Sequence, residues 1–82
     1  MIKKSIKQKV YNFTAIFELN EGGSYTITVP ALPGLVTEGK NLEDAHLMVE
    51  DAIHCYVAGL IKAKERVPLE REIAQLRLAV KV

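Results

Sequence analysis

The side chains best suited to chemistry in this chain are two histidines and one cysteine near its middle. His46 and His54 are eight positions apart, which on a helix separates them by roughly 80° around the axis and by about two turns along it. Ligands so far apart do not hold one metal ion. Cys55 follows His54 directly, but neighbours on a helix point in different directions, so no Cys–His nucleophilic pair is predicted. We expect isolated helix histidines and a semi-buried structural thiol.

The acidic residues do not form the cluster that a metal-dependent nuclease needs. Two-metal catalysis requires several carboxylates that converge on one point. The centre of the first apolar run, Phe13 to Phe17, contains no acid. Tyr25 and Tyr56 lie on apolar faces, where core packing is favoured over stacking on RNA bases. The sequence therefore predicts no catalytic, metal-ligating or cofactor-binding residue.

Composition indicates one small domain that gains stability from association. The chain has 82 residues, of which 49% are hydrophobic, and a domain of this size buries only about 60% of the surface of its unfolded chain. The charges nearly balance, with 11 Lys and Arg against 10 Asp and Glu, which argues against a dedicated nucleic-acid-binding domain. The single cysteine fits a reducing compartment, and no apolar run approaches the ~20 residues of a membrane span. We expect a cytoplasmic homo-oligomer.

The apolar pattern indicates which elements position these residues. Alternation predicts strands over residues 11–19 and 24–29, joined by a turn at Asn20–Gly23, and a shorter strand over 35–38 after the Pro33–Gly34 turn. Asn41 is a good N-cap, so a helix should begin at Leu42 and end near Ala63. Alternation returns over 75–82, where Leu76, Leu78, Val80 and Val82 share one side of a last predicted strand.

These elements predict an α+β fold with one sheet of four strands (β-β-β-α-β) and one helix on one face. A right-handed crossover would place the last strand parallel to the first, in the order 3-2-1-4. The predicted domain spans residues 11–82. Residues 1–10 form a basic N-terminal arm, containing Lys3, Lys4, Lys7 and Lys9, for which a flexible solvated terminus is favoured over phosphate contact.

The segment from Tyr25 to Gly39, with the following Asn41–Ala45, resembles the signature of the HicB family. An aromatic residue leads a strand, a Pro-x-x-Pro-Gly turn follows, a short strand ends in glycine, and a capping residue opens a helix with leucine and acids. The resemblance extends through the helix to Pro68 and more loosely over 11–82. We interpret the matching residues as determinants of the turn and the helix start: Tyr25, Pro30, Pro33, Gly34, Gly39, Leu42 and Ala45.

The resemblance implies a partial RNase H-like fold and an oligomeric antitoxin, a homodimer or homotetramer, whose partner is a HicA toxin, a small mRNA-cleaving protein. Many HicB proteins also carry a C-terminal segment that binds operator DNA. No such segment follows the last predicted strand, so operator binding by this chain is not expected.

The leading hypothesis is that this protein binds and neutralises the toxin by covering its RNA-binding or catalytic surface. Because many such toxins are basic, acids on the exposed helix face are the expected contacts: Glu43, Glu50 and Asp51. Two alternatives remain open. The chain could be a stand-alone oligomeric binding or structural domain without a toxin. It could also be a residual metal-dependent RNase, an alternative that is supported only by fold analogy.

Overall fold

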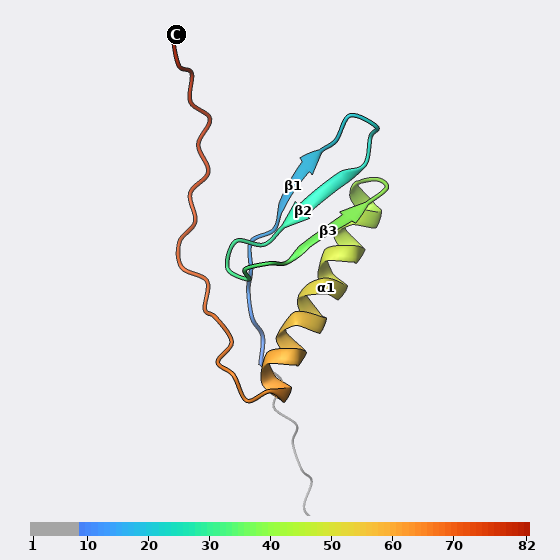
Figure 1. Ribbon diagram of the computed structural model, residues 1–82, viewed down its shortest axis with the longest axis vertical. Coiled ribbons are helices and arrows are strands. Elements are labelled where there is room, and N and C mark those ends of the chain that lie inside the picture. Colours follow the sequence, from blue (N-terminus) through green and yellow to red (C-terminus); the bar gives the residue numbers. More distant parts are fainter. Residues whose placement is uncertain (1–8) are drawn as a thin grey trace, which may run out of the picture.

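The computed structural model describes residues 9–82 and shows a three-stranded sheet covered on one face by one helix (Figure 1). The strands are β1 (Ile16–Leu19), β2 (Tyr25–Thr28) and β3 (Val36–Gly39), and the helix is α1 (Leu42–Lys62). Both strand pairs are antiparallel, in the order β1-β2-β3. Each element therefore packs against its neighbour in sequence.

The two turns of the sheet form where the sequence predicts them. In the first, the Gly23 N–H donates to the Asn20 carbonyl over 3.1 Å, and Gly23 has a φ of +92°. In the second, Gly34 has a φ of +85°, a conformation that glycine adopts without steric cost. The Leu35 N–H donates to the Leu32 carbonyl over 3.1 Å and closes this turn, and the Leu32 side chain is buried in the core.

Helix α1 begins at Leu42, and the predicted N-cap is confirmed. The Asp44 N–H donates to Asn41 Oδ1 over 2.8 Å, and Asp44 Oδ2 accepts from the Lys40 N–H over 2.8 Å. The Asn41 side chain thus accepts from the backbone of the first helical turn, and the Asp44 side chain accepts from the backbone just before the helix. This arrangement resembles a capping box. The helix ends at Lys62, next to the predicted end.

The core lies between α1 and the β2–β3 half of the sheet. Gly39, at the end of β3, is buried directly against the first turn of the helix, and a Cβ added there would lie 2.6 Å from Ala45 Cβ. This close approach leaves no room for a side chain at position 39. The buried core cluster consists of Ile27, Val29, Leu32, Leu35, Ala45 and Val49.

The predicted four-stranded sheet in the order 3-2-1-4 is wrong, because the sheet has three strands and residues 75–82 pair with none of them. After α1, residues 65–82 form an extended segment that runs apart from the sheet (Figure 1). We call residues 74–82 the C-terminal segment. Alternation shows that a segment can form a strand, but it does not show which edge will pair with it.

The first strand is shorter than predicted, since residues 11–15 are extended but lie outside β1. Thr14 in this stretch binds Glu70: its hydroxyl donates to Glu70 Oε2 over 2.7 Å, and its N–H donates to the same carboxylate. The basic arm predicted for residues 1–10 falls almost entirely outside the described residues.

Candidate functional site

The predicted contact acids gather around one exposed leucine on α1. Leu47 has 61% of its surface exposed, although a leucine gains free energy when it is buried. Glu43 precedes it by four positions, Asp51 follows it by four and Glu50 by three, so all three are its neighbours on the helix surface. All three acids are exposed. We call Glu43, Leu47, Glu50 and Asp51 the α1 patch.

The α1 patch lies on a rigid element and faces away from the core. The buried residues Ala45 and Val49 define the side of α1 that packs on the sheet. Leu47 is 200° further around the helix from Ala45, at about 100° per residue, and so points nearly opposite. His46 Nε2 lies 3.5 Å from Glu50 Oε1 at the border of the patch, with both side chains largely exposed. The patch is therefore an exposed surface on the side of α1 opposite the core.

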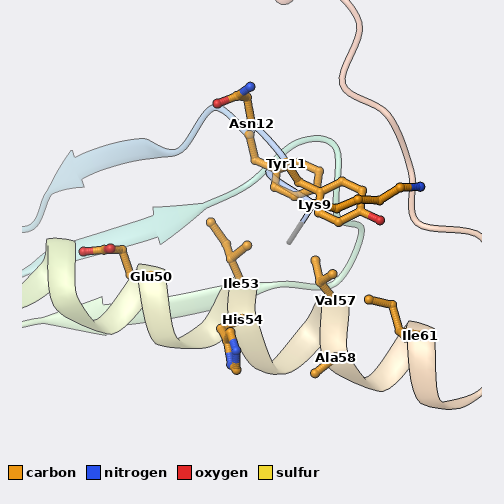
Figure 2. A pocket seen from close by; sticks show the side chains of 10 residues that line it. Lys9, Tyr11, Asn12, Glu50, Ile53, His54, Val57, Ala58 and Ile61 are labelled. Carbon is orange, nitrogen blue, oxygen red and sulfur yellow. The ribbon is translucent and has the colours of Figure 1, made fainter. Parts of the chain in front are cut away.

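A second surface is the groove between α1 and the extended residues 9–13, with a volume of about 560 Å³. Figure 2 shows Ile53, Val57 and Ile61 pointing from α1 toward Tyr11. The Tyr11 and Phe13 rings stack with their centroids 6.2 Å apart. The groove is mainly apolar, with polar groups at its margin: Lys9, Asn12, Glu50 and His54.

The motif residues shape the fold and do not form a reactive centre. Tyr25 is half-buried and packs against the core cluster, directly across from Gly39 in the β2–β3 register. The Tyr56 hydroxyl donates to the Pro33 carbonyl over 2.9 Å and so fixes the turn to α1. Ala45 is fully buried, Pro30, Pro33 and Gly34 are exposed turn residues, and Leu42 is exposed at the helix start.

The histidines and the cysteine stay apart and exposed. His46 and His54 lie on the surface of α1. Cys55 is exposed, so the prediction of a semi-buried thiol is wrong: its position on α1 falls outside the stripe that packs on the sheet. Within residues 9–82, no three His, Cys, Asp or Glu side chains gather to hold a metal ion. In the same residues, no helix is both long enough and apolar enough to cross a membrane.

Sequence reasoning missed Leu47, the centre of the α1 patch. Leu47 does not follow the three- and four-residue spacing of the buried positions, yet it lies between acids at positions −4, +3 and +4. An apolar residue inside an acidic neighbourhood on a predicted helix is a signal that could have identified it.

These features define the class of protein: a small α+β domain with one antiparallel sheet covered by one helix. The chain belongs to the HicB-like antitoxin family, because the family model described as HicB_like antitoxin of bacterial toxin-antitoxin system matches residues 13–81. The resemblance seen in the sequence is thereby confirmed. Family membership indicates a role in a toxin–antitoxin system, with a toxin as the partner.

Three relatives show how widely similar chains occur. A UPF0150 protein of Thermoplasma acidophilum is 39% identical over 56 residues, covering 68% of this chain and 81% of the relative. A UPF0150 protein of Synechocystis is 32% identical over 63 residues, covering 77% and 80%. An uncharacterized 14.9 kDa protein of Haemophilus phage HP1 is 32% identical over 60 residues, covering 73% of this chain and 44% of the relative. No solved structure matches the chain significantly.

Proposed function

We propose that this protein is a non-catalytic, cytoplasmic and homo-oligomeric antitoxin that neutralises a HicA-type mRNA-cleaving toxin by covering its RNA-binding or catalytic surface. The observation that carries the proposal is the family match over residues 13–81, which includes the whole sheet and α1. Occlusion needs a stable surface that complements the toxin and needs no reactive group, and the exposed acids and leucine of the α1 patch support such a contact.

The α1 patch supports this mechanism through its chemistry. A toxin that cleaves mRNA must attract a polyanion, and a positively charged surface does so. Three carboxylates around an exposed leucine combine an apolar anchor with charges that complement such a surface. Because the patch lies on a capped helix, little conformational freedom is lost when it docks.

Co-expression with the protein encoded by the adjacent small reading frame tests the function. We expect that frame to be toxic alone, growth to be restored by this chain, and the two proteins to co-purify. Absence of both toxicity and complex formation would contradict the proposal and favour a stand-alone oligomeric domain. Incubation of the purified chain with RNA and Mg²⁺ or Mn²⁺ should give no cleavage, and metal-dependent cleavage would favour the RNase alternative.

Charge reversal tests whether the α1 patch is the contact. The variant Glu43→Lys/Glu50→Lys/Asp51→Lys should lose growth rescue and toxin binding. The matched control Glu21→Lys/Glu38→Lys/Glu65→Lys changes the net charge equally at exposed acids outside the patch and should retain both. Far-UV circular dichroism of both variants establishes that α1 is still formed. Unchanged toxin binding by the patch variant would remove these acids from the mechanism.

A further inference from the structure

The outer edge of β1 is open. β1 pairs with β2 on one side, and no strand in the described part of the chain pairs with it on the other. The helix does not compensate, because α1 packs against β3 and β2. An open strand edge presents unpaired backbone N–H and C=O groups and is a template for another strand.

The apolar groove adjoins this edge. Residues 11–13 lead directly into β1, and Tyr11 and Phe13 line the groove together with Ile53 and Val57 of α1. Phe13 and Phe17 pack against the core cluster and are partly buried. A strand added along β1 would therefore find backbone partners on one side and apolar side chains beneath it, while the Thr14 N–H before β1 is already bound by Glu70 of its own chain. The outer edge of β3 lacks this advantage, because α1 already covers that half of the sheet.

The same chain contains a segment that fits. In the C-terminal segment, Leu76, Leu78 and Val80 alternate with Arg77, Ala79 and Lys81, so one side is apolar and the other mostly charged. The three apolar side chains are each 77% or 78% exposed. An extended apolar strand without a partner is unfavourable in water. The radius of gyration, 16.6 Å, exceeds the about 12 Å of a compact chain of this length.

We propose that two copies exchange this segment: residues 76–82 of each copy form a strand along β1 of the other, with Leu76, Leu78 and Val80 over the partner's groove. This proposal describes how the homo-oligomer of the proposed function is built. It rests on the proposed function only for the statement that the protein self-associates, and it does not depend on toxin binding. Arg77 and Lys81 would lie on the outer sheet face, where Glu18 of β1 is exposed and of opposite charge.

Reciprocal exchange favours a second copy over any other occupant. Each chain supplies both the strand and the surface that receives it, so one contact is made twice about a two-fold axis. A seven-residue strand is about 23 Å long. Two such strands bury on the order of 1,400 Å² over both partners, which falls within the range of stable interfaces. The hydrogen bonds from Thr14 to Glu70 hold the chain four residues before the C-terminal segment and do not involve that segment, so residues 74–82 can extend to the partner.

Solution mass tests the apolar side of the segment. Light scattering of the purified full chain without toxin should give a dimer. Leu78→Asp/Val80→Asp should weaken dimerisation by about 100-fold, because two apolar side chains can no longer be buried. The matched control Ala79→Asp adds a charge to the other side of the same segment and should remain dimeric. A monomeric native chain, or a double variant that dimerises as tightly as the control, would overturn the proposal.

A mixed-label experiment tests the edge. A Cys55→Ser/Ala79→Cys chain carries a nitroxide and no isotope, and it is mixed with ¹⁵N-labelled Cys55→Ser chain. Any broadening of the ¹⁵N-labelled amide signals therefore reports a nitroxide on another copy. We expect the strongest broadening at the amides of β1 and weaker broadening through β2 to β3, because each step across the sheet adds about 4.8 Å to the distance from the nitroxide. Reduction of the nitroxide should restore the signals. Broadening centred on β3 or on the α1 patch, or its absence, would overturn strand exchange. Because no toxin is present, a negative result in this experiment would overturn strand exchange without contradicting toxin binding.

Discussion

At the scale of single residues, the close approach of β3 to α1 depends on Gly39. Its hydrogen atom takes the place that any other side chain would need, and Ala45 is the helix residue it meets. The two positions are six residues apart in sequence, so the approach also sets the tight connection between strand and helix.

Gly39→Ala should therefore destabilise the fold by about 2 kcal/mol, because the added methyl group forces β3 and α1 apart. Urea unfolding followed by circular dichroism measures the loss. Gly22→Ala is the matched control, since nothing lies within 4 Å of a Cβ there, and its effect should stay within about 0.5 kcal/mol. Equal effects of the two substitutions would show that the close approach does not limit the residue at position 39.

A substitution at Leu47 should change toxin binding without changing the stability of the fold. Leu47→Ala should leave the free energy of unfolding within about 0.5 kcal/mol, because the site is exposed and alanine favours helix. Toxin affinity, measured by titration calorimetry, should fall about tenfold, which corresponds to ~1.4 kcal/mol. Met48→Ala, at an exposed neighbour outside the α1 patch, should bind as the native chain does. A native-like affinity of Leu47→Ala would mean that the toxin does not contact this residue.

At the scale of elements, α1 contains a glycine that its surroundings do not require. A Cβ added to Gly59 would meet nothing within 4 Å, and its φ is not positive. Gly59→Ala should therefore raise the free energy of unfolding by about 0.5 kcal/mol, by restricting the unfolded chain. Ala58→Gly, the reverse change at the adjacent exposed position, should lower it by a similar amount in the same urea titration. A destabilised Gly59→Ala chain would indicate a contact in the assembled protein that requires glycine.

Local signals were enough to predict most elements. Asn41 predicted the start of α1, and Gly34 predicted the second turn, because a cap and a positive φ depend on a few adjacent residues. The fourth strand was predicted wrongly for a related reason. Alternation over Leu76–Val82 is a local property, whereas the identity of the pairing edge is not. The acids of the α1 patch were proposed as toxin contacts from charge, and this contact stays a prediction. Leu47 was missed because it lies outside the three- and four-residue spacing of the buried stripe.

At the scale of the whole molecule, stability should depend on chain concentration. If two copies exchange the C-terminal segment, folding and association are linked, and mass action favours the folded dimer at higher concentration. The midpoint of thermal unfolding should rise between low and high micromolar chain. The Leu78→Asp/Val80→Asp variant should show a constant midpoint over that range. A constant midpoint for the native chain would contradict this linkage.

The sequential packing of β1, β2, β3 and α1 has a consequence for how the protein is made. Each element contacts the next one along the chain, so the loops that must close are short and folding should be fast. Chains fold from the N-terminus while the ribosome adds about 5–20 residues per second. Residues 16–62 leave the ribosome before the C-terminal segment does, so packing of the sheet can begin first. That segment emerges after α1, close to a strand edge that is able to receive a strand from a neighbouring chain.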